Sequence, residues 1–130
     1  HRFGLYDMIL IKDNHVDYAG GTAKAIQAAQ SYLQAKQLNI PIEIEVRNLI
    51  ELNEVIKIGG VDRILLDNFN YYQLKEAVAI INKRFITEAS GGITEENVLQ
   101  FAQCGVDFVS MGALTHSVKS LDMSLKAIKK

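Results

Sequence analysis

The chain has 130 residues, of which 48% are hydrophobic and 22% charged, and it contains one proline. These proportions exclude the disordered classes of protein, because enough apolar material is present to offset chain entropy by burying a single core. The 14 basic and 15 acidic residues give a formal net charge of −1, and no basic stripe is present, so the sequence argues against a nucleic-acid partner.

The cysteine content and the hydropathy pattern bear on the compartment. Cys104 is the single cysteine, so no disulfide can form within the chain, which suits a reducing compartment. No apolar run approaches the ~20 residues that cross a bilayer, so no membrane partner is predicted and we expect a cytoplasmic protein. Because the chain begins at His1 without an initiator methionine, we also expect it to be a piece of a longer protein.

In the first half of the chain, short apolar runs alternate with helical spacing. Residues 8–11 are predicted to form a buried strand, followed by a loop through Gly20–Gly21. Thr22 is predicted to cap a helix that presents one apolar face. A strand at 42–46 follows, and then a helix that ends at Gly59–Gly60.

The second half repeats this alternation. Its pattern predicts strands at 63–67, 85–89 and 108–110, and helices over 74–81 and 98–102, the second helix ending at Gly105. Strands that alternate with helices indicate βαβ units and a parallel sheet.

The predicted strand ends recur with a fixed period. Glu45, Asp67, Ala89 and Met111 stand at positions 45, 67, 89 and 111, a spacing of 22 residues. The tripeptide Gly-Val-Asp occurs at 60–62 and again at 105–107, in the same helix-to-strand turn. Equal βα units that close on themselves form a barrel, so the fold class predicted is α/β, a portion of a parallel (β/α) barrel that resembles an incomplete TIM barrel. A doubly wound open sheet is the alternative.

About five such units do not close an eight-stranded barrel. We therefore expect residues 1–130 to be the carboxy-terminal part of a barrel domain whose first strands lie outside this chain.

Carboxylates gather at the predicted strand ends. Glu43 and Glu45 alternate with apolar residues, so both side chains share one face of their strand. If the isoleucines pack against helices, the glutamates point into the barrel; the alternative is an edge strand with its glutamates in water. Asp67 recurs one unit later, and Lys12 is a plausible cationic partner at the end of the first strand. Two carboxylates at one mouth suit hydroxyl binding or an oxocarbenium-like centre.

Glycines follow the last two predicted strands, in Ser90–Gly91–Gly92 and in Gly112–Ala113. Backbone N–H groups in such loops can form an anion-binding concavity, and barrel enzymes often bind phosphate at this position. The alternative is that the glycines only turn the chain. His116 follows the second loop as either a phosphate donor or a structural residue, and His15 is either functional or a residue that orders its loop.

No spacing of His, Cys and carboxylate residues resembles a closed zinc site, and no Walker or dinucleotide glycine pattern is present. The sequence therefore predicts no metal held by the protein itself.

Five motifs together resemble those of the quinolinate phosphoribosyltransferase family, in the family's order and near its spacing. They cover essentially the whole chain: residues 1–15 (HRFGLYD followed by LIKDNH), EIEV at 43–46, LLDN at 65–68, EASGGI at 88–93 and GALTHS at 112–117.

The resemblance implies an incomplete α/β barrel with a separate amino-terminal domain, which is absent here. Such enzymes convert quinolinate and phosphoribosyl pyrophosphate, with Mg²⁺, to nicotinate mononucleotide, pyrophosphate and carbon dioxide in de novo NAD synthesis. The Mg²⁺ is expected to arrive with phosphoribosyl pyrophosphate and not to occupy a cage of protein ligands. The resemblance also implies cations from the amino-terminal half and from a partner subunit. We therefore expect a homodimer or higher oligomer, and an inactive chain when it stands alone.

Carried onto this sequence, the resemblance assigns three groups of residues. His1, Arg2 and Lys12 are expected to bind the quinolinate carboxylates. Glu45 and Asp67, with Lys12, are the catalytic candidates, and the two carboxylates would hold the ribose hydroxyls and stabilise positive charge at the anomeric carbon. The ribose 5′-phosphate would be surrounded by Ser90, Gly91, Gly92, Met111, Gly112, Ala113 and His116.

Two other functions remain compatible with the motifs. One is a non-catalytic module that binds phosphosugars through the same glycine loops. The other is a paralogous phosphoribosyltransferase that acts on another base.

Overall fold

A computed structural model describes residues 8–112 and 114–121 of the chain. Within them, one sheet contains strands in the order β1 to β6, namely β1 Ile9–Ile11, β2 Ile42–Val46, β3 Arg63–Asp67, β4 Ile86–Ser90, β5 Phe108–Met111 and β6 Leu114–Ser117. The helices are α1 Asp13–Ala19, α2 Thr22–Lys36, α3 Leu49–Ile58, α4 Tyr71–Ile81 and α5 Val98–Ala102.

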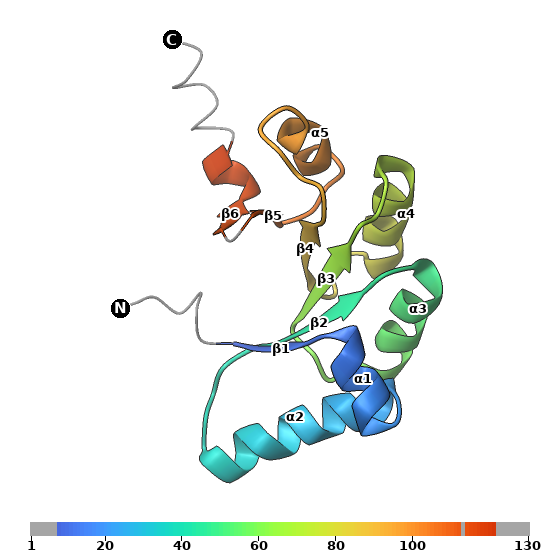
Figure 1. Cartoon of the computed structure of the whole chain (residues 1–130), viewed down its shortest axis with the longest axis vertical. Coiled ribbons are helices and arrows are strands. Elements are labelled where there is room, and N and C mark those ends of the chain that lie inside the picture. The colour runs from blue at the N-terminus through green and yellow to red at the C-terminus, as the bar shows by residue number, and fades with distance from the viewer. Residues whose placement is uncertain (1–7, 113, 122–130) are drawn as a thin grey trace.

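The sheet is parallel from β1 to β5, and β6 returns antiparallel to β5. Figure 1 shows α2 to α5 along the outer side of the curved sheet. The predicted class, a portion of an incomplete α/β barrel, is confirmed. Among the described residues, no helix combines the length and the hydropathy needed to cross a bilayer.

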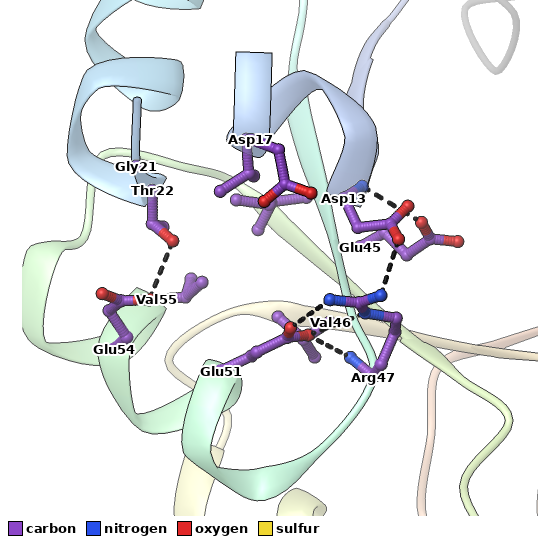
Figure 2. Close-up of a pocket in the computed structure, with 12 residues that line it drawn as sticks. Asp13, Asp17, Gly21, Thr22, Glu45, Val46, Arg47, Glu51, Glu54 and Val55 are labelled. Atoms are coloured by element: carbon purple, nitrogen blue, oxygen red, sulfur yellow. Dashed lines mark hydrogen bonds and ion pairs between the residues drawn. The ribbon is translucent and has the colours of Figure 1, made fainter. Parts of the chain in front are cut away.

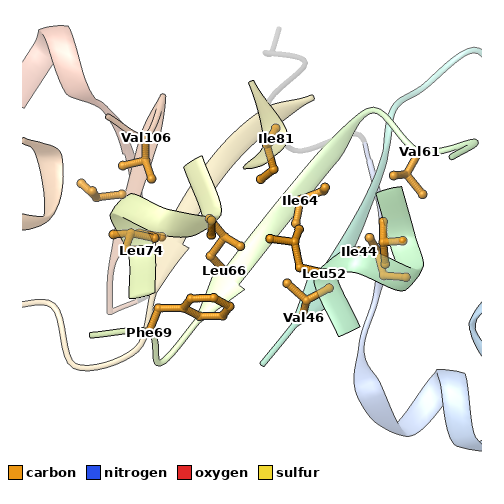
Figure 3. Packing of buried hydrophobic residues seen from close by; sticks show 14 of the residues in the cluster. Ile44, Val46, Leu52, Val61, Ile64, Leu66, Phe69, Leu74, Ile81 and Val106 are labelled. Carbon is orange, nitrogen blue, oxygen red and sulfur yellow. The ribbon is translucent and has the colours of Figure 1, made fainter. Parts of the chain in front are cut away.

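The core lies between the sheet and these helices (Figure 3). Alternate residues of β2 and β3 point toward the helices and are 0–1% exposed: Ile44, Val46, Ile64 and Leu66. They meet apolar helix residues that are equally buried: Leu52, Val55, Leu74 and Ile81. Each such side chain contributes about 1.5–3 kcal/mol when it is fully buried. Because the period of a strand is two, this packing turns the intervening residues, Glu43 and Glu45 among them, toward the inner face of the barrel.

The helix boundaries follow from local capping. The Asn48 side chain accepts a hydrogen bond from the Glu51 N–H at 2.9 Å and begins α3, while the Asn70 side chain accepts from the Gln73 N–H at 2.8 Å and begins α4. The predicted end of α3 at Gly59–Gly60 is confirmed, with Gly59 at a φ of 71°.

The loop predicted before Gly20 is wrong, because residues 13–19 form α1. Gly20, with a φ of 95°, ends this helix through its N–H bonds to the carbonyls of Val16 and Asp17. Gly21 then occupies the cap position of α2, so the capping role predicted for Thr22 is also wrong. The Thr22 hydroxyl instead donates to Glu54 at 2.8 Å, which joins α2 to α3.

After Gly112, where the sequence predicted no strand or helix, the structure has a further strand. Residues 114–117 form β6, which pairs with β5 from Phe108↔Ser117 to Met111↔Leu114. The two strands therefore make a hairpin whose connection contains Gly112, at a φ of 61°.

The two Gly-Val-Asp turns have a structural explanation. The Asp62 carboxylate accepts a hydrogen bond from the Ile42 N–H at the start of β2, and Asp107 accepts one from the Thr87 N–H in β4, both at 2.9 Å. In return, the Asp62 and Asp107 N–H groups donate to the carbonyls of Ile42 and Thr87. Each aspartate thus fastens the amino-terminal part of the neighbouring strand.

Candidate active site

The carboxyl ends of β3 and β4 are joined directly. Asp67 pairs in register with Ser90, and the Ser90 hydroxyl donates to Asp67 Oδ1 at 2.9 Å. The Asn68 N–H also donates to the Ser90 carbonyl at 2.8 Å. A predicted carboxylate and a predicted glycine loop therefore meet at one rim of the sheet.

Gly91 packs tightly against this pair. A Cβ atom built on Gly91 would lie 2.8 Å from the Asn68 nitrogen and 3.1 Å from Asp67 Oδ1, and its φ is 92°. Only glycine fits this position without strain. Gly91 and Asp67 therefore lie in contact at the same end of the sheet.

Glu45 lies on the neighbouring strand end of β2, where its Oε1 accepts a hydrogen bond of 3.4 Å from the Asp13 N–H. Burial raises the pKa of Glu45, the Asp13 N–H lowers it, and the negative charges of Asp67 and Asp13 raise it further. The charge of Lys12 lowers the same pKa. The charges of Asp67 and Lys12, the other two predicted catalytic candidates, thus both act on Glu45, although the three residues come from the ends of three different strands.

An ionic cluster holds α1 beside Glu45 (Figure 2). The Arg47 guanidinium donates to Asp13 Oδ2 and to Glu51 Oε2, each at 2.7 Å, and the Arg47 N–H donates to Glu51 Oε1 at 2.7 Å. Arg47 therefore connects α3 to the helix whose first N–H bonds Glu45. The sequence analysis did not single out Arg47, although its position two residues after Glu45 placed a cation close to that carboxylate.

A cavity of about 250 Å³ lies between this cluster and the start of α2. Its lining includes five acidic residues, Asp13, Asp17, Glu45, Glu51 and Glu54, beside apolar residues and Arg47. None of the residues of the two glycine loops lines it. Because its carboxylates would repel phosphate, this cavity does not suit a phosphate site.

Beneath the rim lies a buried network that the sequence did not reveal. Arg63 Nη2 donates to Glu88 Oε1 at 2.8 Å and Arg63 Nε donates to Glu43 Oε2 at 3.3 Å. The Arg63 guanidinium also lies over the Phe108 ring, 4.5 Å from its centroid. Arg63 lies four residues before Asp67 on β3, so both side chains point to the same face of the sheet, and the sequence could have indicated that Arg63 points inward.

Glu43 points into the barrel, as predicted, and its side chain is buried below the rim. It is 4% exposed, which excludes the alternative of an edge strand with its glutamates in water, and its cation is Arg63. Burial, reinforced by the neighbouring Glu88, raises the pKa of Glu43 to about 8, although Arg63 acts in the opposite direction.

The structure does not bring His116 to the inner face. His116 pairs directly with Val109, which is fully buried toward the helices, whereas Thr115 pairs with Ser110 on the inner side. Paired residues of antiparallel strands share a face. Met111 and Gly112 lie at the end of β5, as expected. His1, Arg2 and Ala113 lie outside the described residues, and the phosphate role of His116 stays a prediction.

The structure gives His15 and Cys104 structural roles. His15 Nδ1 accepts a hydrogen bond from the Lys12 N–H at 3.1 Å and orders the start of α1. Cys104 is buried, with its thiol directed at the Gln100 carbonyl. In the described part of the chain, no group of three or more His, Cys, Asp or Glu residues is arranged to hold a metal ion.

Comparison with known proteins gives one consistent result. The model of a family described as quinolinate phosphoribosyl transferase, C-terminal domain, matches residues 1–126. The mitochondrial quinolinate phosphoribosyltransferase 2a (decarboxylating) of Nicotiana tabacum and the chloroplastic nicotinate-nucleotide pyrophosphorylase (carboxylating) of Arabidopsis thaliana are each 46% identical over 97% of this chain. The chain spans 40% of the length of each relative.

Solved structures agree with the sequence comparison. The nicotinate-nucleotide pyrophosphorylase of Francisella tularensis aligns with a TM-score of 0.75 at 42% identity, covering 87% of this chain and 39% of that protein. A mandelate oxidase aligns with a TM-score of 0.57 at 16% identity over 82% of this chain and 36% of its own, a likeness of fold alone.

Proposed function

This chain belongs to the quinolinate phosphoribosyltransferase family, and from that membership we propose that the protein containing it transfers a phosphoribosyl group to quinolinate. The donor is phosphoribosyl pyrophosphate, and the products are nicotinate mononucleotide, pyrophosphate and carbon dioxide. The observation that carries the proposal is the meeting of Asp67, Ser90 and Gly91 at one rim, with Glu45 on the adjacent strand.

Glu45 and Asp67 are the residues proposed to act at the sugar. Their carboxylates accept hydrogen bonds from the ribose hydroxyls and stabilise the positive charge that develops at the anomeric carbon as pyrophosphate departs. The electrostatic coupling between Glu45 and Asp67 raises the pKa of Glu45, so a cationic centre placed near both favours the ionised pair. The Ser90 hydroxyl holds Asp67 in position at 2.9 Å.

The glycine loops are proposed to bind the 5′-phosphate. Gly91 lies against the Asp67–Asn68 backbone without a side chain between them, so the N–H groups of the loop remain accessible to a phosphate near the sugar site. Ser90, Gly92, Met111, Gly112, Ala113 and His116 complete the proposed phosphate environment. Mg²⁺ would be bound mainly by the pyrophosphate and would neutralise its charge.

Lys12, His1 and Arg2 are proposed to bind the quinolinate carboxylates. Lys12 directly follows β1 and its charge lowers the pKa of Glu45, so a base bound by Lys12 would lie beside the anomeric centre. We also propose a homodimer or higher oligomer in the cytoplasm, although the names of plant relatives place those proteins in mitochondria or chloroplasts.

The roles of the two carboxylates are tested by Glu45→Ala and Asp67→Ala in the full-length protein. We expect each change to lower kcat by about 10²–10³-fold, because each removes charge stabilisation of the transition state. Binding of inorganic phosphate, measured by calorimetry, should change by less than about threefold. Glu76→Ala, on the exposed surface of α4, is the matched control and should leave both quantities unchanged.

Unchanged turnover of quinolinate in both variants would show that the assigned roles are wrong. Calorimetry of the unmodified protein tests the function itself. Binding of phosphoribosyl pyrophosphate without binding of quinolinate would instead indicate the non-catalytic phosphosugar module.

A further inference from the structure

The hairpin of β5 and β6, which carries Gly112, is attached to the sheet by a short ladder. β4 and β5 pair at Glu88↔Phe108 and Ala89↔Val109, whereas β3 and β4 pair at five positions and β5 and β6 at four. The bonds between Asp107 and Thr87 fasten the end of the hairpin that lies away from Gly112. The position of the Gly112 end therefore depends on side chains of the inner face.

Those side chains form a continuous series of contacts. Arg63 on β3 lies over the Phe108 ring of β5 and donates to Glu88 on β4 at 2.8 Å. The second oxygen of the same carboxylate, Glu88 Oε2, accepts a hydrogen bond from the Thr115 hydroxyl at 3.1 Å. Thr115 lies on β6, three positions after Gly112. One carboxylate thus links β3, β4 and β6 across the intervening strand.

The contacts between Arg63 and the two glutamates are shielded from water. The side chains of Arg63 and Glu88 are 12% and 6% exposed, and Glu43 accepts a further bond from Arg63. Charged hydrogen bonds that are shielded from water are stronger than neutral ones and have a more sharply defined geometry. Arg63 and Glu88 therefore present a fixed acceptor to the Thr115 hydroxyl.

We infer that Arg63, Glu88 and Thr115 are positioning residues for the phosphate site. Together they hold the Gly112 end of the hairpin at a set distance from the Gly91–Gly92 loop on β4, so that both loops face one 5′-phosphate. The inference rests on the proposed function, because it assigns the two loops to one phosphate. None of the three residues needs to touch the substrate.

Thr115→Val in the full-length protein tests this inference, since valine keeps the shape of threonine and removes the donor. Thr115 is exposed in the described chain, so the change does not disturb the core. We expect the KM for phosphoribosyl pyrophosphate to rise on the order of tenfold, while the KM for quinolinate and kcat change less than about twofold. Thr115→Ser retains the hydroxyl and should restore the original KM.

Hydrogen exchange provides a readout that does not depend on the reaction. In Thr115→Val, the backbone amides of Val109, Ser110 and Thr115 should exchange on the order of tenfold faster, because local opening of the hairpin becomes easier. Amides of β2 should be unaffected, and Thr115→Ser should again match the original protein.

The outcomes separate the two hypotheses. If the unmodified protein does not turn over quinolinate, the proposed function fails, while faster exchange in the variant still supports the connection between Glu88 and Thr115. If the unmodified protein is active but Thr115→Val changes neither the exchange rates nor the KM for phosphoribosyl pyrophosphate, the inference is wrong. Equal effects of the valine and serine variants would also contradict it.

Discussion

Glu43 shows how one buried side chain can set the charge of the barrel interior. It shares Arg63 with Glu88, and its pKa of about 8 means that it holds its proton at neutral pH. A protonated Glu43 adds no second negative charge beside the Arg63 guanidinium, which limits the unbalanced charge buried there. Alternation along the strand predicted that Glu43 faces inward, but the identity of its partner depends on register between strands, which a single sequence does not specify.

Glu43→Gln should change how stability depends on pH. The pKa of Glu43 is raised from 4.5 to about 8 in the folded protein, so its contribution to stability is complete below about pH 4.5 and is lost as pH rises toward 8. Glutamine cannot ionise, so the stability of the variant relative to the original should increase over this range, by at most about 1.4 kcal/mol per pH unit. Unfolding midpoints between pH 5 and pH 9 measure this, with the exposed Glu76→Gln as control; parallel pH profiles would contradict it.

Gly91→Ala and Gly92→Ala form a matched pair at the rim. Both glycines have a positive φ, of 92° and 70°, but a Cβ at Gly91 would meet the Asn68 backbone at 2.8 Å, whereas a Cβ at Gly92 meets nothing within 4 Å. We expect Gly91→Ala to destabilise the protein by about 1–3 kcal/mol more than Gly92→Ala. Thermal unfolding of the two variants measures the difference, and equal midpoints would show that Asn68 moves aside freely.

At the scale of elements, the two Gly-Val-Asp turns act as fasteners between neighbouring strands. Asp62→Ala and Asp107→Ala should each lower the free energy of unfolding by about 1–3 kcal/mol, because each leaves a strand N–H without its acceptor. Asp107→Ala should cost more, since Asp107 also accepts from the Thr87 hydroxyl at 3.1 Å. Chemical unfolding of both variants, beside Glu76→Ala as the exposed control, measures these costs. A cost below that of the control for either aspartate would contradict the assignment.

Sequence patterns predicted the elements that bury a regular apolar face and missed those that do not. The strands 42–46 and 63–67 carry continuous or alternating apolar residues, and their ends were predicted where the structure has them. In contrast, α1 buries no residue completely and β6 contains one large apolar residue, Leu114, which is 62% exposed. These two short elements depend on neighbours: α1 on the contacts of its first turn with Arg47 and Glu45, and β6 on its pairing with β5.

The sequence likewise predicted the part of the candidate site that lies at the strand ends and missed the two arginines beside and beneath it. Asp67, Ser90 and Gly91 meet because the carboxyl ends of parallel strands lie at one edge, a rule that needs only the order of the strands. The contact of Arg47 with α1 and the network of Arg63 escaped prediction because they depend on partners 34 residues away (Asp13) and 25 residues away (Glu88), on other elements.

At the scale of the whole molecule, the inner face of the sheet is buried at Glu43, Leu65 and Glu88 but exposed at the start of β4. Ile86 is 43% exposed on this face, and the chain spans 40% of the length of the relatives with which it was compared. Within the described residues, the rim contains the acidic Glu45 and Asp67, and Arg47 is already bonded to Asp13 and Glu51. Substrates that carry several carboxylate and phosphate groups would therefore need further cations.

We accordingly expect the 130-residue chain alone to show no transfer of phosphoribosyl groups to quinolinate, and the full-length protein to show it. Assays of nicotinate mononucleotide formation at equal molar concentrations of the two proteins measure the difference. Comparable rates would mean that this chain supplies every group that the reaction needs.

The aspartate fasteners lie at the amino-terminal ends of the strands, whereas the carboxylates and glycine loops lie at the carboxyl ends. A change at Glu45 on the rim would therefore leave the bonds made by Asp62 and Asp107 intact, because those bonds lie at the opposite end of the sheet.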